Sequence, residues 1–96
     1  MTPEAKLLAA CVKELKLLKA GGRRVWWVKL HGSAMMTRGL PDLYVLIEGR
    51  SLWIELKAPG NRPSPLQWHR IGEIQDAGGE SYWCDTLENF KRLLET

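Results

Sequence analysis

This chain lacks the sequence features of a membrane protein, a secreted protein or a zinc-binding protein. No apolar run approaches the roughly 18 residues that a membrane-spanning helix needs. The N-terminus lacks the apolar block of a secretory signal peptide. The two cysteines, Cys11 and Cys84, have no Cys-x-x-Cys or His-x-x-x-His neighbours, which argues against zinc. We therefore expect a cytoplasmic protein with two free, buried thiols.

The chain also lacks the length for a second domain, and it contains no internal repeat or low-complexity segment. Ninety-six residues with 45% hydrophobic content predict one domain over residues 1–96. Such a domain buries about 65% of its unfolded surface, which is enough for a modest core.

The basic residues are in modest excess, and their placement says more than their number. A net charge of +3 and a pI of about 9.1 are compatible with a polyanionic partner but do not establish one. Lys29, Arg38 and Arg62 fall in expected turns or at strand ends, where side chains can reach phosphates. They are candidate DNA contacts, and an ordinary solvated surface is the alternative.

Hydrophobic periodicity and turn residues predict an α/β fold of order αβββαβα, with a mixed sheet flanked by helices. The expected elements are a helix at 3–20, strands at 24–31, 42–47 and 51–57, a helix from 65 to Gly78-Gly79, a strand at 81–84, and a last helix capped by Asp85 or Thr86.

Burial can also be predicted from these patterns. The first helix should bury the stripe Leu8, Cys11, Leu15 and Leu18. The run Val25-Trp26-Trp27-Val28 is apolar on both sides, as in a strand covered on both faces. The second long helix should carry Trp68, Ile71 and Ile74 inward. The loop at 32–39 either shapes a site or is a surface excursion.

The tripeptide Glu-Leu-Lys occurs twice, and only the second copy has charged groups that point the same way. Glu14 and Lys16 lie in the first expected helix, where residues two apart diverge by about 200° around the axis. Glu55 and Lys57 lie in an expected strand, where they share one face about 6.6 Å apart. The second copy therefore projects a carboxylate and an ammonium group together.

Asp42 supplies a second carboxylate at the start of the preceding strand. If the loop between the strands is the dipeptide Glu48-Gly49, the register places Asp42 directly opposite Glu55. Directly opposed residues share a face, with Cβ atoms roughly 5 Å apart. A loop longer by one residue would offset this pairing, and Glu-Gly is a weaker turn signal than Asn-Gly.

These groups suit phosphodiester hydrolysis. The carboxylates of Asp42 and Glu55, with the Leu56 backbone carbonyl, offer the hard oxygens that Mg²⁺ or Mn²⁺ prefers. Lys57 would orient the attacking water and stabilise the charge that develops at phosphorus. Glu4 extends the apolar line of the first helix, and is either a carboxylate favoured by the helix dipole or a group directed at a cation.

In their order and spacing, these residues resemble a known family. Two segments are similar to the Pro-Asp and Glu-x-Lys motifs of the PD-(D/E)XK nuclease superfamily: Gly39-Leu40-Pro41-Asp42-Leu43 and Ile54-Glu55-Leu56-Lys57, with twelve residues between Asp42 and Glu55. Downstream, Ser64-Pro65-Leu66-Gln67 before a helix, then Gly78-Gly79 and a short strand, resemble the VRR-NUC branch, the virus-type replication-repair nuclease domain. The resemblance extends from Glu4 to the last helix.

The resemblance implies a restriction-endonuclease-like core and an Mg²⁺-dependent endodeoxyribonuclease in which Mn²⁺ can substitute. Asp42 and Glu55 would be the metal ligands, Lys57 the catalytic lysine, Gln67 a site residue, and Glu4 the helix carboxylate that helps to hold metal-bound water. Stand-alone members, typically from phages and bacteria, are similar to Holliday junction resolvases and act as homodimers on branched DNA in replication, repair and recombination.

Two other interpretations remain open from the sequence. In the first, Asp42 caps a strand end, Glu55 and Lys57 form a surface ion pair, and Gln67 completes a capping box. In the second, the chain is a non-catalytic nucleic-acid-binding module whose tryptophans stack on bases, although these tryptophans fit core packing better. Cleavage that depends on a divalent metal separates the two functional classes. His31 and His69 are not assigned to the site.

Overall fold

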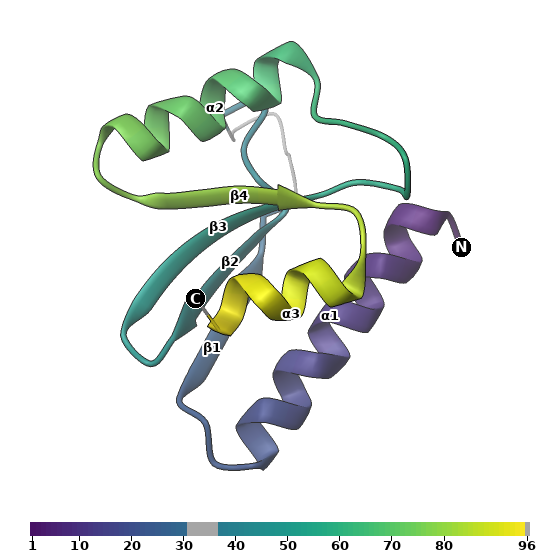
Figure 1. The fold of residues 1–96 in the computed structure, drawn as a ribbon, viewed down its shortest axis with the longest axis vertical. Coiled ribbons are helices and arrows are strands. Elements are labelled where there is room, and N and C mark those ends of the chain that lie inside the picture. Colours follow the sequence, from purple (N-terminus) through teal and green to yellow (C-terminus); the bar gives the residue numbers. More distant parts are fainter. Residues whose placement is uncertain (31–36, 96) are drawn as a thin grey trace.

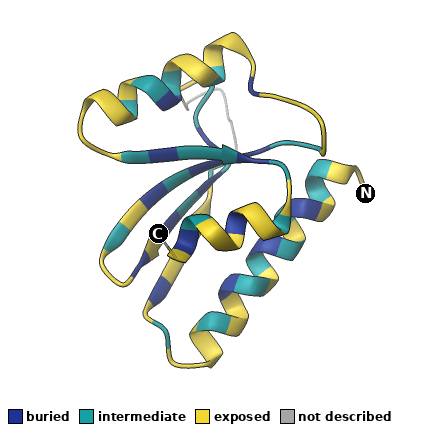
Figure 2. Cartoon of the chain, viewed as in Figure 1, coloured by how far each residue is buried: buried dark blue, intermediate teal, exposed yellow. Residues whose placement is uncertain are grey.

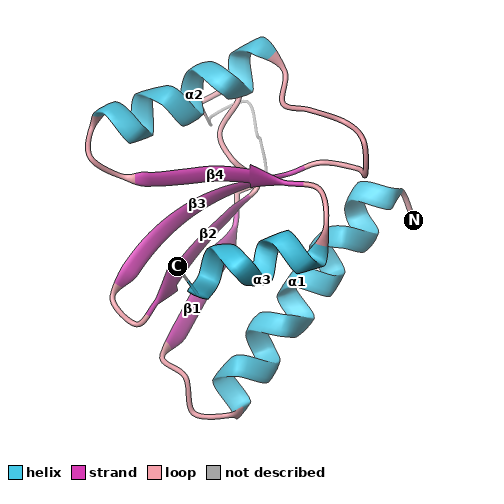
Figure 3. Cartoon of the chain, in the orientation of Figure 1, coloured by secondary structure: helices cyan, strands magenta, loops and turns pink. Residues whose placement is uncertain are grey.

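The computed structural model describes residues 1–30 and 37–95, and its elements occur in the predicted order αβββαβα (Figures 1 and 3). They are α1 (Pro3–Ala20), β1 (Val25–Lys29), β2 (Leu43–Ile47), β3 (Arg50–Leu56), α2 (Pro65–Asp76), β4 (Glu80–Cys84) and α3 (Leu87–Glu95). The strands lie in the order β1-β2-β3-β4, with antiparallel pairing through β3 and parallel pairing of β3 with β4. The predicted mixed sheet is confirmed.

The core lies between one face of the sheet and two helices. Figure 1 shows α1 and α3 on one side of the sheet and α2 on the other, beside β4. Alternate residues of β2 and β3 point toward α1 and α3, as strand geometry requires. The main buried side chains are Leu7, Cys11, Leu15, Leu43, Val45, Ile47, Leu52, Ile54, Leu56, Cys84, Phe90 and Leu94. Both cysteines are free and buried, as expected.

Side-chain caps fix where the helices begin. The Thr2 hydroxyl accepts a hydrogen bond from the Ala5 amide at 3.1 Å, and Pro3 occupies the first turn of α1. The Thr86 hydroxyl accepts from the Asn89 amide at 3.1 Å at the start of α3. Within the described residues, no helix is long and apolar enough to cross a membrane.

Several burial predictions were wrong. In α1, Leu7 is buried, and Leu8 is only half-buried against the core. Of the three residues expected to point inward from α2, Ile71 is buried and Ile74 half-buried, as predicted, but Trp68 is 45% exposed. No tryptophan belongs to the buried core, although Trp27 packs partly against it. The exposed tryptophan rings lie outside the area that the three helices cover.

The strand β1 is covered on one face only, contrary to the expectation of two-sided burial. Val25 is buried, but on the other face Trp26 is 54% exposed and Val28 is 37% exposed (Figure 2). The expected strand at 24–31 is also shorter in the structure, from Val25 to Lys29. Residues 31–36, which include His31 and most of the expected loop at 32–39, lie outside the described residues.

Candidate functional site

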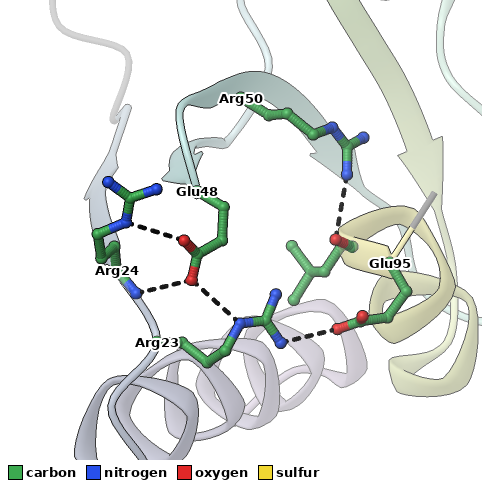
Figure 4. A network of polar contacts seen from close by, with 6 residues as sticks. Arg23, Arg24, Glu48, Arg50 and Glu95 are labelled. Carbon is green, nitrogen blue, oxygen red and sulfur yellow. Dashed lines mark hydrogen bonds and ion pairs between the residues drawn. The ribbon is translucent and has the colours of Figure 1, made fainter.

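The turn between β2 and β3 has the predicted two residues. Glu48 and Gly49 adopt φ values of 48° and 81°, and a two-residue hairpin with both residues left-handed matches the twist of the strands. A left-handed glutamate is unusual. Here its carboxylate accepts hydrogen bonds from the Arg24 amide at 3.1 Å and the Arg24 Nε at 2.9 Å, and also from the Arg23 Nε at 3.3 Å (Figure 4). These bonds, led by that of the Arg24 amide, lower the pKa of Glu48.

This turn sets the register that the sequence argument required. Ile47 pairs with Arg50 and Leu43 with Ile54, so the next residues along the two strands are Asp42 and Glu55. Asp42 links the neighbouring strands at this end of the sheet by hydrogen bonds. Its Oδ2 accepts from the Leu56 amide at 2.9 Å, and its backbone oxygen accepts from the Leu30 amide at 2.7 Å. The predicted convergence of Asp42 and Glu55 is therefore confirmed as geometry.

Glu55 is a buried carboxylate that lacks hydrogen bonds. Its side chain is 1% exposed, and neither oxygen has a hydrogen-bond partner among the described residues. Burial, and then the neighbouring Asp42 carboxylate, raise the pKa of Glu55 to about 8, against the opposing effect of Lys57. A buried carboxylate without a partner is costly, so the fold positions this group for a ligand outside the described chain.

Glu4 completes a cluster of three carboxylates. It lies in the first turn of α1, and one oxygen each from Glu4, Asp42 and Glu55 lie within 4.8 Å of one another. A pocket of about 210 Å³ opens beside them, lined in part by Glu4, Asp42 and Leu56. Of the two interpretations of Glu4 that the sequence left open, the structure places it where a carboxylate directed at a cation would lie.

The cluster fits a divalent cation. It consists of carboxylate oxygens, the hard ligands that Mg²⁺, Mn²⁺ and Ca²⁺ prefer. The Glu55 oxygens are the strongest sign, because they accept no hydrogen bond from the described residues and a bound cation would contact them directly. The Leu56 amide donates to Asp42, Leu56 lines the pocket, and in a strand the carbonyl of a residue points to the same side as its amide.

Lys57 lies directly beyond β3, next to the cluster. Its amide donates to the Cys84 carbonyl at 3.0 Å, which holds the residue against β4. Its Nζ is 3.8 Å from Glu55 Oε2, and the side chain is only 18% exposed. The pair is therefore not the surface ion pair of the alternative interpretation, because Glu55 is buried.

Gln67 adopts the capping geometry. Its Oε1 accepts from the Ser64 amide at 2.9 Å, and its own amide donates to the Ser64 hydroxyl at 3.2 Å, which forms a reciprocal capping box at the start of α2. The alternative, in which the side chain turns toward a phosphate or a water at the site, is not the conformation seen. Gln67 does not line the pocket beside the carboxylate cluster.

The three predicted DNA contacts are exposed but scattered. Lys29 ends β1, Arg38 precedes Gly39, and Arg62 lies between β3 and α2. None of the three forms an ion pair with a carboxylate of residues 1–30 or 37–95. His69 lies 3.6 Å from Glu73 on the exposed side of α2, which agrees with leaving it out of the site.

Sequence reasoning missed a second candidate feature, a row of aromatic rings beside the cluster. Tyr44 contacts Trp53 and Trp26 edge to face, with ring centroids 4.9 and 6.2 Å apart. Strand alternation could have found it, because Trp53 lies two residues before Glu55 and Tyr44 two residues after Asp42, on the same face of the sheet.

Comparison with known proteins gives the fold. No family model matches the chain, and neither does any curated protein. A solved structure described as a VRR_NUC domain is similar to it, with a TM-score of 0.80 and 20% sequence identity over 99% of this chain and 97% of that chain. The fold that the sequence motifs implied is confirmed: this chain folds as a VRR_NUC domain does.

Proposed function

We propose that this protein is a metal-dependent endodeoxyribonuclease that hydrolyses phosphodiester bonds. One observation carries the proposal: on a VRR_NUC-type fold, a buried carboxylate with no hydrogen-bond partner lies with two further carboxylates at the end of the sheet. A purely structural ion pair does not need three carboxylates within 4.8 Å of one another.

Each residue of the site would have a role that suits its chemistry. Asp42, Glu55 and the Leu56 carbonyl would hold Mg²⁺ or Mn²⁺, which would supply charge neutralisation at the phosphate and lower the pKa of a water. Glu4, on its own helix, would hold water at the edge of the cluster. A water oxygen forms the new bond to phosphorus while the bond to the leaving oxygen breaks.

Lys57 would position that water and stabilise the additional negative charge of the transition state. Its ammonium group is 3.8 Å from Glu55 and mostly shielded from solvent, so its charge acts at short range with little screening. The Glu55 carboxylate in turn keeps the lysine side chain at the cluster.

From the resemblance of its motifs, we further propose branched DNA as the substrate and a homodimer as the active form. Resolution of a four-way junction requires two cuts, and the described residues contain one carboxylate cluster. Two copies related by a two-fold axis would supply two clusters at a fixed separation.

A cleavage assay tests the proposal. The purified protein is incubated with labelled linear, flap and four-way-junction DNA in Mg²⁺, Mn²⁺ or EDTA, and the cut positions are mapped. We expect cleavage with either metal and none in EDTA. Asp42→Asn and Glu55→Gln should abolish it, since both keep the side-chain shape and remove metal-binding charge.

The chain offers its own control for this assay. Glu14→Gln changes the first Glu-Leu-Lys tripeptide, on α1, where Glu14 only approaches Lys91 at 3.9 Å. Cleavage should persist in this variant. Near-wild-type cleavage in Asp42→Asn or Glu55→Gln would overturn the metal assignment, and binding without cleavage under every metal condition would favour the non-catalytic module.

A further inference from the structure

Away from the carboxylate cluster, the same face of the sheet continues as a connected aromatic surface. Trp53 of β3 lies directly opposite Tyr44 of β2, and Trp26 of β1 lies diagonally beyond Tyr44, with edge-to-face contacts at 4.9 and 6.2 Å. The Tyr44 hydroxyl and the Ser51 hydroxyl are 2.8 Å apart and hydrogen-bonded, which fixes the central ring. The row therefore presents a rigid platform.

This surface is open to solvent at its β1 end. The helix α2 packs over β4, at the opposite edge of the sheet from β1, and the described residues leave Trp26, Val28 and Leu46 exposed by 54%, 37% and 36%. Grouped exposed apolar side chains on one face mark an interaction surface. Trp26 has the most exposed ring of the platform.

A basic pocket lies at the end of the row. It measures about 430 Å³, and Trp26 and Leu46 line it together with Lys19 and Arg24. The Arg24 side chain is 82% exposed and uses its Nε to bind Glu48, while Lys19 Nζ lies 5.9 Å from the Trp27 ring centroid. Lys19 forms no ion pair with a described carboxylate, so its charge is available to an anion.

We propose that this face binds a single-stranded segment of DNA, with a base stacked on Trp26 and a phosphate in the pocket beside Lys19 and Arg24. The exposed ring of Trp26 next to cations fits a nucleotide, whose base and phosphate need the two kinds of contact. A duplex hides its base faces in the stack, so its bases cannot use the ring. A second copy of this chain would bring a second basic pocket to the same surface, and like charges would oppose that contact.

The platform and the cluster are close enough to act on one strand. Asp42 and Leu46 are four residues apart along β2, which corresponds to about 14 Å. A strand held at Trp26 would therefore pass over Tyr44 and Trp53 and reach the cluster within a few nucleotides. This consequence rests on the proposed function and makes the preferred substrate a DNA with a single-stranded arm beside the cut. The binding itself does not depend on cleavage.

Binding in EDTA tests the inference separately from the nuclease activity. Fluorescence anisotropy of a labelled oligothymidylate of about 12 nucleotides gives the affinity, and a blunt duplex of the same length is the comparison. Trp26→Ala should weaken oligothymidylate binding by about ten-fold, which corresponds to about 1.4 kcal/mol. The control is Trp68→Ala, because Trp68 is also exposed but lies on α2 against Trp83. It should bind as the unchanged protein does.

The phosphate contact has its own measurement. Lys19→Gln should lower the slope of log affinity against log salt by about 0.7 for a single strand. Lys13→Gln is the control, since Lys13 is exposed on α1 outside the pocket and should leave the slope unchanged.

The outcomes separate this inference from the proposed function. Equal oligothymidylate affinity in Trp26→Ala and the unchanged protein, with both folded by circular dichroism, would overturn the platform. So would tighter binding of the blunt duplex, or a dimer that Trp26→Ala dissociates while oligothymidylate binding persists. Binding that depends on Trp26, in a protein that never cleaves with Mg²⁺ or Mn²⁺, would support the platform and reject the nuclease.

Discussion

At Glu55, a carboxylate with 1% exposure lies beside two further carboxylates and has no hydrogen-bond partner among the described residues. The other Glu-Leu-Lys tripeptide shows how much this depends on position. Glu14 lies on a helix, retains 19% exposure and approaches only Lys91, at 3.9 Å. The same three residues therefore give a single half-buried ion contact on a helix and a candidate metal ligand on a central strand.

Lys57 can be separated from the metal ligands by experiment. Lys57→Ala should reduce cleavage at least ten-fold, about 1.4 kcal/mol in the barrier, because it removes the charge that positions water and stabilises the transition state. It should leave the affinity for Mn²⁺, measured by calorimetry, nearly unchanged. Lys16→Ala, in the first tripeptide, is the control. A large loss of Mn²⁺ affinity in Lys57→Ala would mean that Lys57 organises the cluster instead.

The raised pKa of Glu55 predicts an unusual dependence of stability on pH. Its pKa rises from 4.5 to about 8 on folding, so over that window the folded protein holds a proton that the unfolded chain releases. Without divalent metal, the free energy of unfolding should fall as the pH rises from 5 to 8, by at most about 1.4 kcal/mol per pH unit. The pKa values of Glu48, Glu73 and Glu80 are lowered, so their effects lie below this window.

Urea unfolding at several pH values checks this prediction. Glu55→Gln should remove the fall, because glutamine carries no titrating proton. Mg²⁺ should stabilise the unchanged protein more at pH 8 than at pH 5, since it binds the ionised carboxylate. A stability that stays level from pH 5 to 8 in the metal-free protein would show that Glu55 is ionised there.

At the scale of elements, the turn at Glu48-Gly49 determines the geometry of the site, although it lies at the opposite end of β2 and β3. The two strands carry Asp42 and Glu55 to the same place only because the loop has two residues and Ile47 pairs with Arg50. Gly49 has φ 81°, and a Cβ there would meet no atom within 4 Å, so a side chain would be opposed by the backbone conformation alone.

Gly49→Ala should therefore lower the free energy of unfolding by about 1 to 2 kcal/mol. Gly72→Ala is the matched control. A Cβ at Gly72 also meets no atom within 4 Å, but this glycine lies in α2 and has no left-handed conformation, so alanine should stabilise by up to about 1 kcal/mol. Thermal or urea unfolding measures both. Equal effects of the two substitutions would contradict the role given to the turn.

The start of α2 raises a different question, because the resemblance gives Gln67 a role in the site and the structure gives it a capping box. Gln67→Ala should cost on the order of 1 kcal/mol of stability. Gln67→Glu keeps the capping oxygen, so we expect unchanged stability and unchanged cleavage. A ten-fold loss of cleavage in Gln67→Glu would instead place the side chain beside the phosphate, where an added negative charge repels the substrate.

Elements that depend on local signals were predictable from the sequence. Thr2-Pro3, Ser64-Pro65 and Thr86 fixed the helix starts, and the period-two pattern fixed the strands. The convergence of Asp42 and Glu55 followed from strand register. The burial of β1 was predicted wrongly. The run Val25-Trp26-Trp27-Val28 is apolar on both faces, and the sequence does not reveal that one of these faces lacks a covering helix. The burial of Glu55 could not be predicted either, because it depends on how α1, α2 and β4 pack around the end of β3.

At the scale of the whole molecule, the two ends of the sheet differ in charge. The carboxylate cluster lies where β2 begins and β3 ends, while Arg23, Arg24 and Lys19 surround the opposite end. Two ion pairs of Glu48 and the contact of Arg23 with Glu95 hold that end together (Figure 4). A metal would offset the acidic end before a phosphate could approach, so metal binding should precede tight DNA binding at the cluster.

The proposed homodimer gives the last prediction. Light scattering should show a particle of twice 10.9 kDa at micromolar concentration. Its two clusters should cut a four-way junction in a paired manner. Mixing the unchanged protein with an excess of Asp42→Asn, after exchange of subunits, should convert paired cutting into single nicks, because each mixed dimer has one working cluster. A monomer that still makes paired cuts would contradict the dimer. If the Asp42→Asn excess left paired cutting intact, the two cuts would have to come from one subunit acting twice.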